Sequence, residues 1–304
     1  MKNHLIIDGF NLAYRSHYAF INLETPAGLL SGCVYGFLVG ARSLKTKYPD
    51  CHITVAWDTE STRRKQMDPT YKANRNKFEL PEQINDLKSI FQCFNASQAE
   101  YQGEEADDII SSLAKKYSDE GSKVFISTSD KDMLQLVRNG KVYVIRPKKG
   151  AVAEKVFDEE AVKELFGVGP EDMECYQSFK GDAVDNIPGV PRVKTACLID
   201  LIQKYKTPQN IYANLDKEKL TDFQRQSLID SEQRVYLNTG LVKLRNDLKV
   251  NVYKGSDNED TLGLYINKYA IKSIDPSKFI NSFRDVACFT TRTAPAIQSY
   301  SIFD

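Results

Sequence analysis

The chain has 304 residues, and its 41 Lys and Arg residues balance 41 Asp and Glu residues, so the formal net charge is zero. Its 41% hydrophobic and 27% charged content is that of a globular protein, which excludes a disordered or fibrous chain. A neutral total argues against coating nucleic acid or membranes through overall charge. No apolar run reaches membrane-spanning length, and the first residues lack the apolar core of a signal peptide. We therefore expect a cytoplasmic protein, and a monomer.

Four Val- and Ile-rich runs in the first half of the chain predict buried strands, at residues 4–8, 52–58, 123–130 and 141–145. Helical patterns lie between them, at residues 30–47, 81–94 and 107–117. This alternation predicts an α/β core over residues 1–155, with a mostly parallel sheet flanked by helices. Further helical patterns then predict a mainly helical region over residues 156–290, at 158–166, 171–179, 194–205 and 220–244. Residues 291–304 have the pattern of a tail.

Acidic residues gather where the predicted strands end. Asp8, Asp58 and Asp130 each close a predicted strand, and the carboxyl ends of parallel strands meet at one edge of a sheet. The other candidates stand at predicted helix starts or turns, and they are Asp132, Glu105, Asp107, Asp108, Asp182 and Asp185. The last two are three residues apart, which would put both on one side of a helical turn. Taken alone, acids in a first helical turn are more often caps than ligands.

Together, the nine carboxylates predict a metal site. Apposed carboxylates repel one another and stay ionised only beside a cation. The set contains only oxygen donors, so Mg²⁺ fits it, with Mn²⁺ as a substitute. Two such ions about 4 Å apart are the usual means of in-line phosphodiester cleavage, because one activates water and the other stabilises the leaving oxygen.

A basic segment at residues 61–77 follows Asp58, with six Lys or Arg against one Asp. A charge run is usually a solvated face, but this one leaves the sheet beside a predicted ligand and would overhang the acid edge. Lys72 and Arg75 would share one helical face, and Tyr71 offers a ring on which a base could stack. The candidate nucleic-acid contacts are therefore Tyr71 and four cations of the segment: Arg63, Arg64, Lys72 and Arg75.

Five stretches of the chain resemble the structure-specific 5′ nucleases, in that family's order: residues 5–15, 68–75, 103–108, 126–133 and 180–190. The family includes the 5′→3′ exonuclease domain of bacterial DNA polymerase I, the bacteriophage flap endonucleases and the phage RNase H type. The resemblance covers about residues 4–245 and no polymerase domain. It implies a stand-alone enzyme of DNA replication and repair, with a helical arch at about residues 60–80 and a helix–hairpin–helix-like DNA-binding region.

The resemblance also implies roles for the matching residues. The nine acids would hold two metal ions, with Asp182 and Asp185 at the outer one, and Asp130 would be essential for turnover. Lys72 and Arg75 would engage the scissile phosphate from the arch and neutralise the charge that develops on it. The implied substrates are DNA with 5′ flaps or nicks, and RNA–DNA hybrid ends such as RNA primers.

One departure from the family lies after residue 190. The family usually runs through a Gly-x-Gly hairpin, whereas this chain passes over residues 191–193 directly to Lys194. Glycines in such hairpins let backbone N–H groups approach phosphates, so their loss puts the family's K⁺ site in question here. Arg192 and Lys194 could compensate through their charge. The alternative is that both are ordinary surface cations at a helix start.

The tail gives a weaker indication of partners. Its residues 301–303 resemble sliding-clamp docking peptides, although a disordered tail is the favoured interpretation. A sliding clamp and a single-strand-binding protein are thus candidate partners. Two other functions compete with the 5′ nuclease: a PIN-like ribonuclease, which lacks the 180–190 segment, and a non-catalytic nucleic-acid-binding module, which would lack one or two of the acids.

Overall fold

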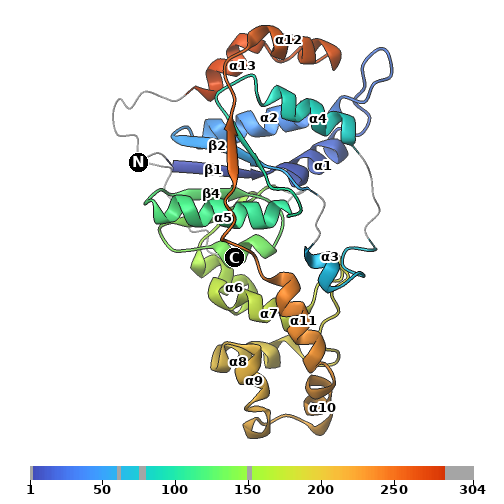
Figure 1. Ribbon diagram of the computed structural model, residues 1–304, viewed down its shortest axis with the longest axis vertical. Coiled ribbons are helices and arrows are strands. Elements are labelled where there is room, and N and C mark those ends of the chain that lie inside the picture. The colour runs from blue at the N-terminus through green and yellow to red at the C-terminus, as the bar shows by residue number, and fades with distance from the viewer. Residues whose placement is uncertain (1–2, 60–62, 75–79, 149–152, 285–304) are drawn as a thin grey trace, which may run out of the picture.

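A seven-stranded sheet forms the centre of the computed structural model, which describes residues 3–59, 63–74, 80–148 and 153–284 (Figure 1). The strand order is β6-β5-β4-β1-β2-β3-β7. Five strands run parallel: β1 (Asn3–Asp8), β2 (Cys51–Ala56), β3 (Ser97–Glu100), β4 (Val124–Ser127) and β5 (Val142–Arg146). The antiparallel edge strands are β6 (Lys155–Phe157) and β7 (Asn251–Lys254). The predicted mostly parallel α/β sheet is confirmed.

The central strand β1 marks the point where the strand order reverses. It pairs with β2 on one side and with β4 on the other. The chain adds β2 and β3 on the first side and then returns to add β4 and β5 on the second. Open α/β sheets bind their ligands at such a switch point, beyond the carboxyl ends of the strands.

Helices cover both faces of the sheet, and β1 sends alternate side chains into two cores. Leu5 and Ile7 belong to the core that also contains residues of α2 (Gly32–Lys47) and α4 (Pro81–Ile90), and α1 (Gly9–Ala19) packs on α2. Ile6 belongs to the other core, with α5 (Ala106–Asp119). Each of these wholly buried side chains stabilises the fold by about 1.5–3 kcal/mol.

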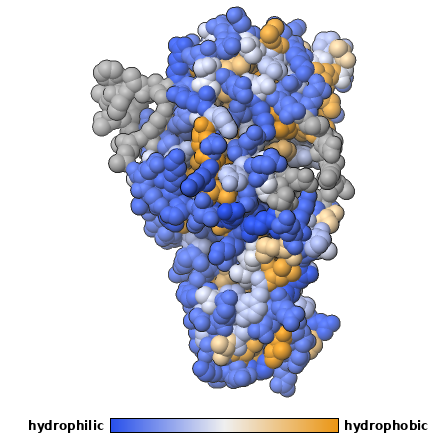
Figure 2. All heavy atoms as spheres, viewed as in Figure 1, coloured by the Kyte–Doolittle hydropathy of each residue, from blue (hydrophilic) through white to orange (hydrophobic). Residues whose placement is uncertain are grey.

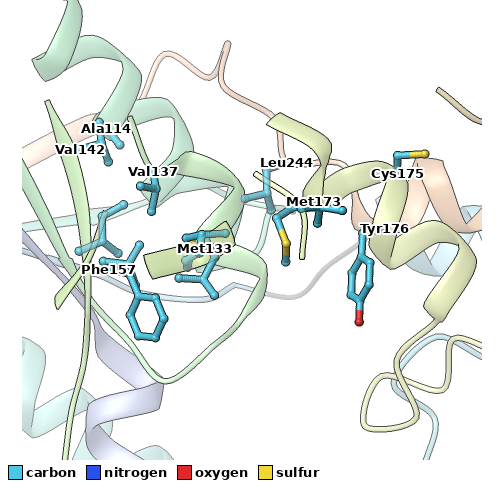
Figure 3. Close-up of a cluster of buried hydrophobic side chains, with 14 of the residues drawn as sticks. Ala114, Met133, Val137, Val142, Phe157, Met173, Cys175, Tyr176 and Leu244 are labelled. Carbon is cyan, nitrogen blue, oxygen red and sulfur yellow. The ribbon is translucent and has the colours of Figure 1, made fainter. Parts of the chain in front are cut away.

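A mainly helical region lies below the sheet in Figure 1. Its helices are α6 (Glu159–Phe166), α7 (Met173–Lys180), α8 (Thr195–Tyr205), α9 (Pro208–Tyr212), α10 (Asp222–Asp230) and α11 (Glu232–Val242), with short 3₁₀ turns η1 (Asp132–Leu136), η2 (Pro170–Asp172) and η3 (Leu215–Lys217). Figure 3 shows Met133, Met173 and Leu244 side by side in one buried cluster. The helical region therefore shares a core with the sheet and is held against it.

The chain returns to the sheet after α11. Strand β7 pairs with β3, and the helices α12 (Glu259–Lys268) and α13 (Pro276–Phe283) belong to the core of α2 and α4. The stretch from 251 to 283 thus packs on the α/β core, which differs from the expected extension of the helical region to 290. Within the described part of the chain, every helix is too short or too polar to cross a bilayer.

Several local predictions were wrong. The single helix expected at 220–244 is two helices that meet at Ser231, and the first helix, α1, was not predicted. In the described residues 63–74 of the expected arch, the short helix α3 (Arg63–Met67) is followed by turns in which Lys72 is left-handed (φ 56°), so Lys72 is not on a helical face. The predicted arch residue Arg75 and the tail at 291–304 lie outside the described residues.

Candidate metal centre

Five acidic side chains line one pocket at the switch point of the sheet. Asp8 ends β1, Asp58 follows β2, and Asp130 follows β4. Glu105 caps α5 at its N-terminal end and Asp107 lies in the first turn of that helix. The acids come from four segments that are far apart in the sequence, and strand order alone brings them to one edge.

Hydrogen bonds fix the carboxylates of this edge. Asp8 caps α1 through a backbone N–H and also accepts the Thr128 hydroxyl at 2.8 Å. The same Thr128 oxygen accepts the N–H of Asp130 at 3.0 Å. Asp58 accepts the N–H of Ala106 at 2.8 Å, which ties the end of β2 to the start of α5. These carboxylates thus accept backbone N–H groups at helix starts, as the alternative interpretation of acids as helix caps predicts. The same carboxylates still line the pocket.

The electrostatics of the pocket favour a bound cation. Burial, together with the neighbouring Asp58, raises the pKa of Asp8 from 3.8 to about 7. Burial raises the pKa of Asp107 well above its ordinary value, and Asp130 adds to the effect. These carboxylates are poorly stabilised as anions by the protein alone, so a bound cation would be strongly favoured.

A second acid group lies beside the first. Oxygens of Asp132, Asp182 and Asp185 lie within 4.8 Å of one another. Gln177 donates to Asp132 at 2.6 Å, and the Lys131 ammonium lies 3.0 Å from Asp182. Asp182 and Asp185 belong to a tight turn rather than a helix, in which Asp182 and Ile187 exchange backbone hydrogen bonds. The group places three carboxylates where one cation could contact all of them.

Lys72 joins the two acid groups. Its ammonium lies 2.6 Å from the Glu105 carboxylate and 3.9 Å from the Asp185 carboxylate. The backbone N–H of Lys72 donates to the backbone carbonyl of Asp185 at 2.9 Å. Burial alone would lower the pKa of Lys72, but Glu105 beside it raises the pKa above its ordinary value. Lys72 thus stays charged on the pocket wall.

Two predicted nucleic-acid contacts are buried instead of exposed. Tyr71 is 5% exposed, and its hydroxyl donates to Glu105 at 3.1 Å, so its ring is not available for a base to stack on. Arg64 is 2% exposed and donates to Glu105 and Asp108. Asp108, expected among the metal ligands, is wholly buried and faces Arg64, while its neighbour Asp107 lines the pocket. Arg64 is therefore not free to contact DNA, and Asp108 does not face the metal pocket, because the two side chains bind each other.

Of the other predicted cations that the structure describes, Arg63 is half-buried and two are exposed. Arg63 donates to the carbonyls of Gly240 and Lys243 at the end of α11. Arg192 and Lys194 lie in the turn before α8, in the helical region of Figure 1, and both are exposed. The Arg192 guanidinium lies 5.1 Å from the centre of the Phe223 ring. The face in Figure 2 is mainly hydrophilic, with separate hydrophobic patches.

Sequence reasoning missed the part of the pocket wall that α1 forms. The pocket is also lined by five residues of this helix: Phe10, Asn11, Tyr14, Arg15 and Tyr18. Asn11 and Ser129 exchange two hydrogen bonds and so join α1 to the loop of Asp130. The four-residue spacing of Phe10, Tyr14 and Tyr18 after Asp8 is the signal that could have revealed this face.

The donor set decides which ions fit the site. The acids of the two groups present carboxylate oxygens, and hard divalent cations such as Mg²⁺ and Mn²⁺ prefer these donors. The half-buried Lys72 beside these acids, at the switch point of a parallel sheet, is an arrangement that suits a divalent-metal-dependent hydrolase of phosphate esters.

The comparisons with known proteins give the family. The model of the 5′-3′ exonuclease N-terminal resolvase-like domain matches residues 3–167, and that of the 5′-3′ exonuclease C-terminal SAM fold matches residues 168–258. The chain belongs to the 5′-3′ exonuclease family and is a 5′ nuclease of DNA replication and repair. It is 36% identical to a 5′-3′ exonuclease of Aquifex aeolicus, over 83% of this chain and 85% of that protein.

Two further matches agree with this assignment. The chain is 31% identical to DNA polymerase I of Bacillus caldotenax over 87% of its own length, but over 31% of the length of the polymerase. The bacteriophage T5 D15 flap endonuclease, solved as a pseudo-enzyme-product complex with DNA and metal ions, has the same fold (TM-score 0.62, 21% identity, 93% of this chain and 98% of that chain). The match to the SAM fold model includes residues 180–190. A PIN-like ribonuclease is expected to lack this segment, so the match argues against that alternative.

Proposed function

We propose that the chain hydrolyses phosphodiester bonds at 5′ flaps, nicks and RNA–DNA hybrid ends, with two Mg²⁺ ions as cofactors and Mn²⁺ as a substitute. The observation that carries this proposal is the pair of adjacent acid groups that Lys72 joins. Asp8, Asp58, Glu105, Asp107 and Asp130 would hold one ion. Asp132, Asp182 and Asp185 would hold the other.

The protein's own residues would bind and orient the scissile phosphate. When bound, the two ions would supply Lewis-acid chemistry that activates water and stabilises the leaving oxygen. Lys72, held on the pocket wall by Glu105, would neutralise charge on the phosphate in the transition state. Arg75 would assist as a second cation, which the resemblance implies.

DNA would have its scissile phosphate in the pocket and would extend from there across the surface of the helical region. The exposed Arg192 and Lys194 and the half-buried Arg63 would contact its backbone, because phosphate contacts position a protein on nucleic acid. The flap-endonuclease name of the T5 neighbour and its DNA complex support this substrate class. A role of the tail in binding a sliding clamp or a single-strand-binding protein, a monomeric state and a cytoplasmic location stay predictions.

The test is a cleavage assay on 5′-labelled flap, nicked and RNA–DNA hybrid substrates with Mg²⁺, with Mn²⁺ and with EDTA. We expect cleavage with either metal ion, none with EDTA, and none by the Asp130→Asn variant. Wild-type protein that cleaves none of the three substrates in either metal ion would refute the proposal. Cleavage confined to one substrate would narrow the specificity.

A further inference from the structure

We propose that Arg64 and Asp108 form a positioning pair, which holds the two acid groups at a fixed separation and binds neither metal nor DNA. The proposal rests on the metal site proposed above and adds two residues to it. Arg64 comes from the basic segment and Asp108 from the predicted ligand set, so both receive a role that differs from the sequence prediction.

Asp108 directs its oxygens at Arg64 and the backbone, and the Arg63 guanidinium lies further away, 3.6 Å from Oδ1. Its Oδ2 accepts Arg64 Nη1 at 2.5 Å, and its Oδ1 accepts Arg64 Nη2 at 3.1 Å. The Oδ1 atom also accepts the N–H of Arg245 at 2.8 Å. A two-pronged arginine–carboxylate contact fixes distance and orientation together, and it satisfies a carboxylate that is 0% exposed.

Arg64 connects α5 with the end of α11. Its Nη1 donates to Glu105 Oε2 at 2.7 Å, which holds that carboxylate on the pocket wall. Its Nε donates to the Leu241 carbonyl at 2.8 Å and its Nη2 to the Lys243 carbonyl at 3.3 Å. The last turn of α11 contains no Lys or Arg of its own, so Arg64 caps carbonyls that a helix end leaves without partners.

The contacts continue from α11 to the second acid group. Asn238 is wholly buried one turn before Leu241, and its Nδ2 donates to the carbonyls of Ser178 (2.9 Å) and Pro188 (2.8 Å). These two residues flank the turn that carries Asp182 and Asp185. A continuous path therefore runs from Glu105 through Arg64 and one turn of α11 to the second group.

This geometry requires an arginine rather than any cation. Arg64 reaches Glu105, Asp108 and two carbonyls with three nitrogens in a planar fork, and the single ammonium of a lysine could satisfy only some of them. Partners of metal ligands that orient them typically change metal affinity 10–100-fold when mutated. Altering the pair should therefore weaken metal binding without removing a ligand.

The experiment titrates metal-free full-length protein with Mn²⁺ by calorimetry, with the melting temperature in EDTA as a check of folding. Arg64→Lys and Asp108→Asn should each weaken Mn²⁺ binding about tenfold with an unchanged number of ions. The double variant should be little worse than either single one, because the two residues act as a unit. The matched controls are Arg284→Lys, at an exposed arginine that pairs with Asp257 outside both acid groups and should leave Mn²⁺ binding as in the wild type, and Asp107→Asn, which should bind Mn²⁺ most weakly.

Three other results would each overturn the inference. If Asp108→Asn behaves like Asp107→Asn while Arg64→Lys binds normally, Asp108 is a metal ligand. If both pair variants melt earlier but bind Mn²⁺ like the wild type at a temperature where they are folded, the pair is merely structural. If the wild type binds no Mn²⁺, the proposed function fails and the pair's role fails with it, whereas the first two results overturn the pair alone.

Discussion

The carboxylate of Asp8 should destabilise the metal-free protein at neutral and alkaline pH, and Asp8→Asn should relieve this cost. The pKa of Asp8 is about 7 in the folded protein, against an ordinary value of 3.8, because the side chain is buried beside other acids. The folded state therefore binds this proton more tightly than the unfolded state. The corresponding stability is fully present below pH 3.8 and is lost as the pH rises to about 7.

The size of the effect follows from these two values. At 1.36 kcal/mol for each pH unit between them, the cost is about 4 kcal/mol at pH 8 and about 2 kcal/mol at pH 5. Asparagine keeps an oxygen for the helix cap but disturbs the bond from Thr128, which offsets about 1 kcal/mol. We therefore expect Asp8→Asn to be about 3 kcal/mol more stable than the wild type at pH 8, and about 1 kcal/mol more stable at pH 5.

The assay is urea unfolding of both proteins in EDTA at the two pH values. Added Mn²⁺ should reverse the order, because it stabilises the wild type through a ligand that the variant lacks. A variant that is less stable than the wild type at pH 8 in EDTA would show that the protein already stabilises the Asp8 anion. The account of a pocket that favours a bound cation would then be wrong.

Three further predictions concern catalysis, the second acid group and DNA. Lys72→Ala should lower single-turnover flap cleavage by about 10²–10³-fold, and unchanged cleavage would exclude its role at the phosphate. Gly189→Ala would place a methyl group 2.1 Å from a backbone carbonyl oxygen, so it should lower both the melting temperature and the Mn²⁺ affinity. The control is Gly263→Ala on α12, where the nearest atom to the new methyl group is 3.9 Å away, and it should lower neither. Arg192→Ala and Lys194→Ala should each reduce the salt slope of duplex binding by about 1, and an unchanged slope would make them ordinary surface cations.

The sheet and the acids at its strand ends were predictable because both depend on local patterns. Apolar runs such as 4–8 and 52–58 can be buried on two faces only in a parallel sheet, and parallel strands end at one edge. Residue types and spacing thus indicated Asp8, Asp58 and Asp130 before the strand order was known. The structure adds that β1 and β4 are neighbours, which creates the crevice.

The difference between Asp107 and Asp108 could not be predicted from the sequence. The two residues are adjacent, and about 100° of helix rotation separates their side chains, so how α5 packs decides which one enters the pocket. The packing in turn depends on Arg64, whose partners at Asp108 and Leu241 are 44 and 177 residues away. Strand β7 was missed for a similar reason, since four residues with little apolar content become a strand through pairing with the distant β3.

The zero net charge of the chain hides a separation of charge. Eight of the 41 acids form the two groups at the sheet edge, which leaves 33 other acids against the 41 Lys and Arg of the whole chain. The basic segment, however, contributes less to the surface than its sequence suggests, because Arg64 and Lys72 neutralise acids of the protein itself. For this reason the salt slope of duplex binding should depend more on residues of the helical region than on Arg64.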